Sequence, residues 1–214
     1  MNTKKLTTLA MLSAIALVLT AFARVPVVLF LRYDPKDVII AIGGFIYGPM
    51  AAFLIAVVVS AIQMFTVSQT GPWGLLMNII TSSAFCCTAA YIYKKNRTMK
   101  GAVYGLIAGF FVATVVAMLW NYLVVPIYMG ITREDAARLL LPAFLPFNLI
   151  SNGLNAAFTI LLYKQIKVIL QRAKLLPPPS EQSSPAKFSF GLLLAAAFVA
   201  VTCVLWVLVL QGIL

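Results

Sequence analysis

The amino-acid sequence predicts an all-α integral membrane protein. Of its 214 residues, 63% are hydrophobic and only 10% are charged, and the mean hydropathy is +1.02. A soluble domain carries about a quarter charged residues, so most of this chain is expected to lie in a bilayer. Apolar stretches long enough to cross a bilayer as helices recur along the chain, separated by short polar breaks.

Seven apolar segments are predicted to form membrane helices. By residue number they are 6–23, 38–47, 50–65, 73–93, 101–126, 143–163 and 188–210. The second and third come from one apolar stretch, 38–65, which is long for one span and short for two full ones. Gly48-Pro49 in its middle is a turn signal, so we expect a short helix, a tight turn and a second helix.

The distribution of charge supports this division of the chain. With the N-terminus in the cytoplasm, the inner side receives eleven basic residues and one acidic residue, and the outer side five basic and four acidic residues. The inner basic residues are Lys4, Lys5, Lys94, Lys95, Arg97, Lys100, Lys164, Lys167, Arg172, Lys174 and Lys187. This asymmetry follows the positive-inside rule. A single span over 38–65 would move the basic loop 94–100 to the outside.

A linker rich in proline and serine, LLPPPSEQSSPAK at 175–187, separates the last apolar segment from the others. Such a composition favours an extended or disordered connection. The sequence therefore predicts a membrane domain over 1–174, the linker, and an additional transmembrane helix within 188–214.

Several classes of function are disfavoured by residues that the sequence lacks. There is no histidine, and the predicted helices carry no charged side chain deep in their apolar segments. Proton relays inside membranes usually need Asp, Glu or His, so a proton-driven transporter is not expected. The GxxxxGK[ST] loop that binds ATP is also absent. We therefore predict a protein that is not an enzyme, has no ATPase of its own and needs no cofactor.

The net charge and the cysteines have ordinary explanations. Lys and Arg gather in predicted cytoplasmic loops, which explains the charge of +11 without nucleic-acid binding. Cys86, Cys87 and Cys203 lie in apolar segments and lack the spacing of metal ligands. We expect them to be small buried side chains, with no metal site and no disulfide.

A row of neutral polar residues is the most informative feature of the sixth segment. In PFNLISNGLNAAF, residues 146–158, the polar side chains are those of Asn148, Ser151, Asn152 and Asn155. Their spacing places them on one face of a helix. Because unpaired amides in hydrocarbon are costly, this face must contact either another helix or a bound ligand.

Further amides and aromatic residues extend this candidate site. The complete set of candidate binding residues is Tyr33, Trp73, Asn78, Trp120, Asn121, Asn148, Ser151 and Asn152. Amides offer paired donors and acceptors to a neutral heterocycle, and aromatic rings offer faces for stacking. The set suits an uncharged planar ligand that arrives from outside, with segment 24–37 or 66–72 closing over it. The alternative is that the asparagines only join helices by hydrogen bonds.

Small residues in the first segment form a second candidate surface. Ala10 and Ala14 form an AxxxA pair, which allows another helix to approach closely. The pair is either a docking face for a partner membrane subunit or a site of internal packing.

Four blocks carry a resemblance to a known family. YDPKDVIIAIGGFIYGPMAA, TVSQTGPWGLLMNIITS, LWNYLVVPIYMG and LLLPAFLPFNLISNGLNA, in this order, resemble the riboflavin-binding S components of energy-coupling factor (ECF) transporters. The resemblance spans roughly residues 5–170. It implies a compact six-helix membrane bundle in the bacterial cell membrane that captures riboflavin, or a related flavin, from outside. It also implies as partners a transmembrane T component and two cytoplasmic ATPase subunits.

The resemblance also assigns roles to particular residues. Asn121 and Asn148 match the amides that bind the polar edge of the flavin ring, and Ala10 and Ala14 match the motif that docks to the T component. The family commonly has lysine where this chain has Ser151, which keeps a hydroxyl but loses charge and reach. Asn152 could compensate. A different vitamin as the ligand, or a non-transport assembly protein, remain the alternatives.

Overall fold

The computed structural model describes residues 3–28, 31–66, 71–175 and 190–210. Most of the predicted linker and the middle of the segment 66–72 lie outside these residues. The elements are α1 (Thr3–Phe22), β1 (Val25–Val28), β2 (Leu31–Tyr33), α2 (Lys36–Tyr47), α3 (Pro49–Thr66), α4 (Gly71–Lys95), α5 (Met99–Met129), α6 (Arg133–Leu139), a π-helical turn η1 (Leu140–Phe144), α7 (Leu145–Arg172) and α8 (Phe190–Leu210).

Each of the seven predicted membrane helices corresponds to a helix of the structure, which confirms the all-α membrane fold. Five helical segments in the described part of the chain are long and apolar enough to cross a membrane, whereas α2 has only 12 residues. The predicted turn between α2 and α3 is made by Gly48, whose φ of 94° is a conformation that favours glycine. The short helix and tight turn expected within 38–65 are therefore present.

The polar segment between α1 and α2 is more ordered than the sequence suggested. β1 and β2 form an antiparallel hairpin in which Val25 pairs with Tyr33 and Pro26 with Arg32. The helix that follows begins at Lys36, so Lys36 and Asp37 belong to its first turn. The helix therefore begins two residues before the predicted segment 38–47, and Lys36, which the sequence analysis placed in a polar break, is only 2% exposed.

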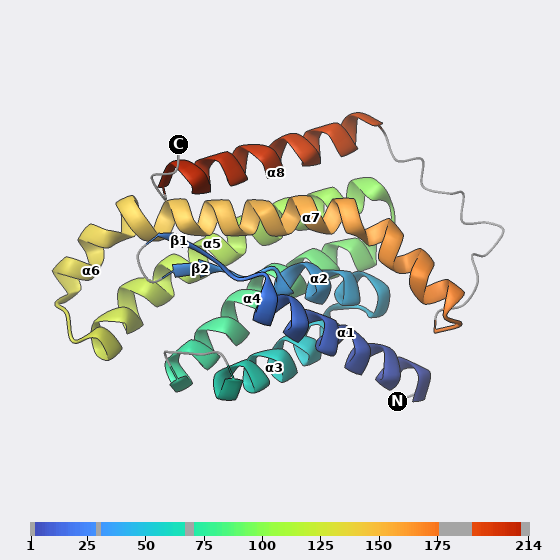
Figure 1. Ribbon diagram of the computed structural model, residues 1–214, viewed down its shortest axis with the longest axis horizontal. Coiled ribbons are helices and arrows are strands. Elements are labelled where there is room, and N and C mark those ends of the chain that lie inside the picture. Colours follow the sequence, from blue (N-terminus) through green and yellow to red (C-terminus); the bar gives the residue numbers. More distant parts are fainter. Residues whose placement is uncertain (1–2, 29–30, 67–70, 176–189, 211–214) are drawn as a thin grey trace.

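The two ends of the bundle differ in charge. Figure 1 shows the N-terminus, the connection between α4 and α5 and the C-terminal end of α7 toward one end of the molecule. The hairpin, the start of α4 and α6 lie toward the other end. The first end carries the basic residues at Lys94–Lys100 and Lys164–Lys174, in the arrangement that the charge pattern of the sequence predicts.

Helices α4 and α5 approach each other closely through glycines. A Cβ atom at Gly105 would lie 2.6 Å from the carbonyl oxygen of Ala89, and one at Gly109 would lie 2.6 Å from that of Phe85. These distances leave no room for a side chain between the two backbones. The pair is a small-xxx-small contact of the kind that joins helices in membranes.

Helix α8 lies along α7 at the edge of the bundle (Figure 1). Buried residues of α7, of α8 and of the hairpin form one apolar cluster, while the buried residues of α1 to α5 form a second cluster with Tyr163 of α7. The predicted additional C-terminal helix is therefore a packed part of the structure.

Replacement of Gly105 by valine is expected to destabilise the protein by about 1–3 kcal/mol or more, because the new side chain forces α4 and α5 apart. Thermal unfolding in detergent measures the effect. Ile107→Val introduces the same residue into the same helix at a half-exposed position and serves as the control. An equal melting temperature for the two variants would contradict the close contact.

Candidate ligand-binding site

A cavity of about 210 Å³ lies where the hairpin, α2, α4, α5 and α7 meet. Its wall combines residues from segments that are distant in the sequence, from Arg24 to Asn155. The volume is below the range of about 300–1,000 Å³ that is usual for small-molecule pockets. A ligand of the usual size therefore extends beyond this volume or moves part of the wall outward.

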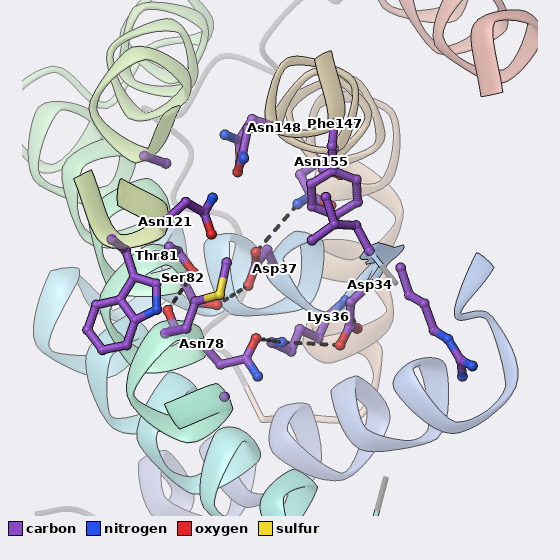
Figure 2. A pocket seen from close by; sticks show the side chains of 18 of the residues that line it. Asp34, Lys36, Asp37, Asn78, Thr81, Ser82, Asn121, Phe147, Asn148 and Asn155 are labelled. Carbon is purple, nitrogen blue, oxygen red and sulfur yellow. Dashed lines mark hydrogen bonds and ion pairs between the residues drawn. The ribbon is translucent and has the colours of Figure 1, made fainter. Parts of the chain in front are cut away.

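The amides of α5 and α7 form one side of the cavity. Asn121 is 1% exposed and Asn148 is 7% exposed, yet both line the cavity. Figure 2 shows the two side chains near each other, on neighbouring helices. Ser151 and Asn152, from the next turn of α7, also line it, as does Trp120 beside Asn121. Five of the eight residues predicted for the site thus come together on this side.

Three polar atoms on this side have unused hydrogen-bonding capacity. The indole Nε1 of Trp120, the amide Nδ2 of Asn121 and the hydroxyl Oγ of Ser151 are buried and have no hydrogen-bond partner among the described residues. A buried polar group without a partner costs about 1–3 kcal/mol. All three can donate a hydrogen, so this side of the cavity is suited to a ligand that presents several acceptors.

The polar row of α7 is divided between the cavity and neighbouring groups. Asn148 Nδ2 donates to the carbonyl oxygen of Phe144 at 2.8 Å, and Asn152 Nδ2 donates to Thr114 Oγ1 at 3.1 Å. Asn155 accepts from the Tyr33 hydroxyl at 3.0 Å. The row therefore makes hydrogen bonds within the bundle and also lines the cavity. The amide nitrogen of Asn152 is therefore engaged by Thr114.

The opposite side of the cavity is charged, which the sequence did not suggest. Lys36 Nζ lies 3.1 Å from Asp34 Oδ2 and donates to Asn78 Oδ1 at 2.9 Å. Asp37 accepts from Ser82 Oγ at 2.6 Å. All five of these residues line the cavity, and Figure 2 shows Asp37 between the amides of α5 and α7 and the Lys36–Asn78 contact. Of the predicted residues, only Asn78 belongs to this side.

Asp34 connects this charged group to the surrounding helices. Its carboxylate accepts from Thr20 Oγ1 of α1 at 2.8 Å and from Gln63 Nε2 of α3 at 2.7 Å. Burial alone would raise the pKa of Asp34. The Lys36 ammonium, the Thr20 hydroxyl and the Arg24 guanidinium together hold its pKa below the usual value. The carboxylate is therefore ionised at neutral pH.

Sequence reasoning missed Asp34, Lys36 and Asp37 because a cluster of charges between two apolar segments is typical of a loop. One signal was present in the sequence. Pro35 stands directly before Lys36, and proline is favoured at the start of a helix. That signal would have extended the predicted helix 38–47 toward its N-terminus, which places Lys36 and Asp37 in its first turn.

Tyr33 and Trp73 occupy different positions from the amides. Tyr33 is buried and does not belong to the described cavity lining. Its hydroxyl donates a hydrogen bond to Asn155, which does line the cavity. Burial and then the nearby Asp37 raise the pKa of Tyr33, so the phenol stays protonated and donates. Trp73 lines the cavity from the first turn of α4 and is 39% exposed.

The predicted docking residues lie apart from the cavity. Ala10 and Ala14 are both exposed on α1, whereas Leu9, Leu12 and Ala16 of the same helix are buried. The AxxxA pair therefore does not serve internal packing in this chain. It faces lipid or a partner.

Comparison with known proteins places the chain in a family. Residues 4–163, about three quarters of the chain, match the family of the substrate-specific component of ECF transporters. The chain belongs to this family. As an S component, it is a multi-pass membrane protein and a transporter subunit that works with an energising module, rather than an enzyme. Helix α8 follows the matched residues.

Individual relatives resemble this S component over most of their length. The riboflavin transporter RibU of Staphylococcus aureus is 34% identical over 79% of this chain and 93% of its own. The riboflavin transporter FmnP of Bacillus subtilis is 28% identical over 81% of this chain and 97% of its own. The solved S component of a bacterial ECF transporter has a TM-score of 0.66 and 32% identity, over 79% of this chain and 98% of that one.

Replacement of Asp34 by alanine is expected to destabilise the S component by about 3–5 kcal/mol, because it leaves the buried Lys36 ammonium without its carboxylate. The contribution of Asp34 is present at neutral pH and is lost only as the pH falls through its lowered pKa. Thermal unfolding at pH 7 measures the loss. Glu134→Ala removes an exposed carboxylate at the same end of the molecule and should leave the melting temperature unchanged.

Proposed function

We propose that this S component captures riboflavin from outside the cell and delivers it to the ECF energising module in the bacterial cell membrane. The proposal depends mainly on three buried donors that line the cavity: Trp120 Nε1, Asn121 Nδ2 and Ser151 Oγ. None of them has a hydrogen-bond partner among the described residues. The similarity to relatives that are riboflavin transporters supports riboflavin as the ligand that satisfies them.

The polar edge of the flavin ring complements these atoms. That edge carries two carbonyl oxygens and a ring nitrogen as acceptors, and one N–H as a donor. Asn121 Nδ2 and Ser151 Oγ would donate to the carbonyl oxygens. Asn148 Nδ2 is already engaged by Phe144, so its Oδ1 is free to accept the N–H of the ring. The apolar part of the ring would lie against Phe147, which also lines the cavity.

Ser151 suits a neutral ring, although the family resemblance implies a lysine at its position. A short hydroxyl reaches less far than an ammonium and adds no charge, so each of the remaining donors matters more in this chain. We infer that recognition of the ring depends mainly on Asn121 and Asn148, and that a related flavin with the same polar edge is also accepted.

The charge difference between the two ends of the bundle supports an orientation, and the family resemblance supports the partners. The basic end would face the cytoplasm, which places the N-terminus there and opens the cavity at the outer end, beside the hairpin and α6. The exposed pair Ala10 and Ala14 would dock to the transmembrane T component, and two cytoplasmic ATPase subunits would supply the energy.

Purification of the S component from cells supplied with riboflavin tests the ligand directly. We expect a yellow protein whose bound compound has the mass of riboflavin, and a stripped protein that quenches the fluorescence of added riboflavin. Competition with other vitamins distinguishes riboflavin from a different planar heterocycle. A colourless protein that leaves riboflavin fluorescence unchanged would rule out the proposal.

Asn121→Ala and Asn148→Ala are each expected to weaken riboflavin binding by about 1–3 kcal/mol, because each leaves a ligand group without its hydrogen bond. Fluorescence titration measures the dissociation constant, and size-exclusion chromatography measures the folded yield. Asn96→Ala, in the exposed turn before α5, is the matched control. A lower yield with an unchanged dissociation constant would mean that these amides only join helices.

Ala14→Leu is expected to abolish riboflavin uptake by cells that contain the energising module, while riboflavin binding by the purified protein stays unchanged. The larger side chain would prevent close approach of the T component to α1. Ala195→Leu makes the same change on an exposed face of α8 and should leave uptake intact. Normal uptake by the Ala14 variant would place the docking surface elsewhere.

A further inference from the structure

Helix α8 is the part of the structure for which the family gives no account. The family match ends at residue 163, whereas α8 begins at Phe190. One face of α8 is buried against the bundle through Ala196, Ala200 and Val207. The opposite face carries large exposed side chains, including Phe198 at 72% exposure. Ala196 and Ala200 are four residues apart on the buried face, and such a pair of small residues lets a helix pack closely on a neighbour.

The contact between α8 and α7 is close at its centre. A Cβ atom at Gly153 of α7 would lie 3.4 Å from the sulfur of Cys203, so a glycine on one helix faces a small residue on the other. Gly153 directly follows Asn152 in the part of α7 that lines the cavity. Helix α8 is therefore seated behind the cavity-lining part of α7.

The same helix also reaches the hairpin. Val27, Leu31 and Tyr33 belong to one apolar cluster with the buried face of α8, and α8 contacts β1 directly. Leu31 and Arg32 in turn line the cavity. A hairpin of two strands is only marginally stable by itself, so its position depends on what it packs against.

The two strands of the hairpin are held in different ways. The β2 end is fixed by hydrogen bonds, from the Tyr33 hydroxyl to Asn155 and from Thr20, Gln63 and Lys36 to Asp34. Val27 of β1 is held by apolar packing in the cluster that includes α8. β1 does not line the cavity itself, but it pairs with β2, whose Leu31 and Arg32 do. Movement of β2 away from the cavity therefore carries β1 out of its apolar contact with α8.

We propose that α8 is a brace within the chain that holds the β1–β2 hairpin against α7 and thereby slows the exchange of ligand between the cavity and the outside. Outward movement of the hairpin must break its apolar contact with α8 in addition to its other contacts. Since α8 is tethered to α7 by the same chain, its docking is intramolecular and does not depend on protein concentration. The proposal rests on the proposed function for the choice of riboflavin as the probe.

Two variants and one control test the brace by the rate at which bound riboflavin dissociates after dilution. Ala200→Leu places a larger side chain between α8 and α7, and a chain that ends at Lys174 lacks α8. The family match covers residues 4–163, so the shortened chain retains every matched residue. We expect both to release riboflavin about tenfold faster, since most affinity changes within one site appear in the dissociation rate. Ala195→Leu, on the exposed face, should release it at the original rate.

A second measurement does not require riboflavin. Arg32 is exposed on β2, so trypsin cleavage after Arg32 reports how often the hairpin leaves its place. We expect the chain ending at Lys174 to be cleaved several-fold faster than the full chain. If folded variants release riboflavin at the rate of the full chain, the brace is refuted. If the full chain binds no riboflavin, the proposed function fails, and an unchanged cleavage rate would then refute the brace separately.

Discussion

The buried ion pair between Lys36 and Asp34 is the interaction on which the arrangement of this S component depends. A charged pair inside a membrane protein is tolerated only when its members are fully hydrogen-bonded. Here Asp34 gathers donors from α1 and α3, and Lys36 reaches Asn78 of α4. One ion pair therefore fixes the start of α2 relative to three other helices. Helix α2 is too short to be held in place by its length, so this polar attachment determines where its first turn lies.

The cavity has one side on which hydrogen bonds are complete and another on which they are not. The charged side, around Lys36, is occupied by its own contacts. On the amide side, three donors have no acceptor among the described residues: Trp120 Nε1, Asn121 Nδ2 and Ser151 Oγ. If the proposed ligand binds here, the charged side would offer it a fixed surface, and binding at the amide side would remove the cost of buried donors without partners. An S component has no ATPase of its own. Its part in transport is therefore to bind the ligand, while the energising module supplies the energy.

The helices and part of the site followed from the sequence, whereas the charged side and the hairpin did not. Apolar stretches predict membrane helices well because lipid imposes the same requirement on every residue of a span. The row from Asn148 to Asn155 could be placed on one face from its spacing alone. Whether each amide bonds to a neighbour or stays free depends on residues such as Thr114 and Tyr33, which come from distant segments. Asp34, Lys36 and Asp37 were assigned to a loop because only the folded chain shows that their charges are buried together.

The glycine contact between α4 and α5 has a consequence for how such a protein diversifies. Two backbones that touch at Gly105 and Gly109 leave α4 and α5, which both supply residues to the cavity wall, almost no freedom to move relative to each other. The β1–β2 hairpin is held by a few side chains instead. Substitutions in the hairpin can alter the shape of the cavity without disturbing the contact between α4 and α5. Substitutions that change ligand preference in related chains should therefore occur mainly in the segment between α1 and α2, and only rarely at the glycines of the α4–α5 contact.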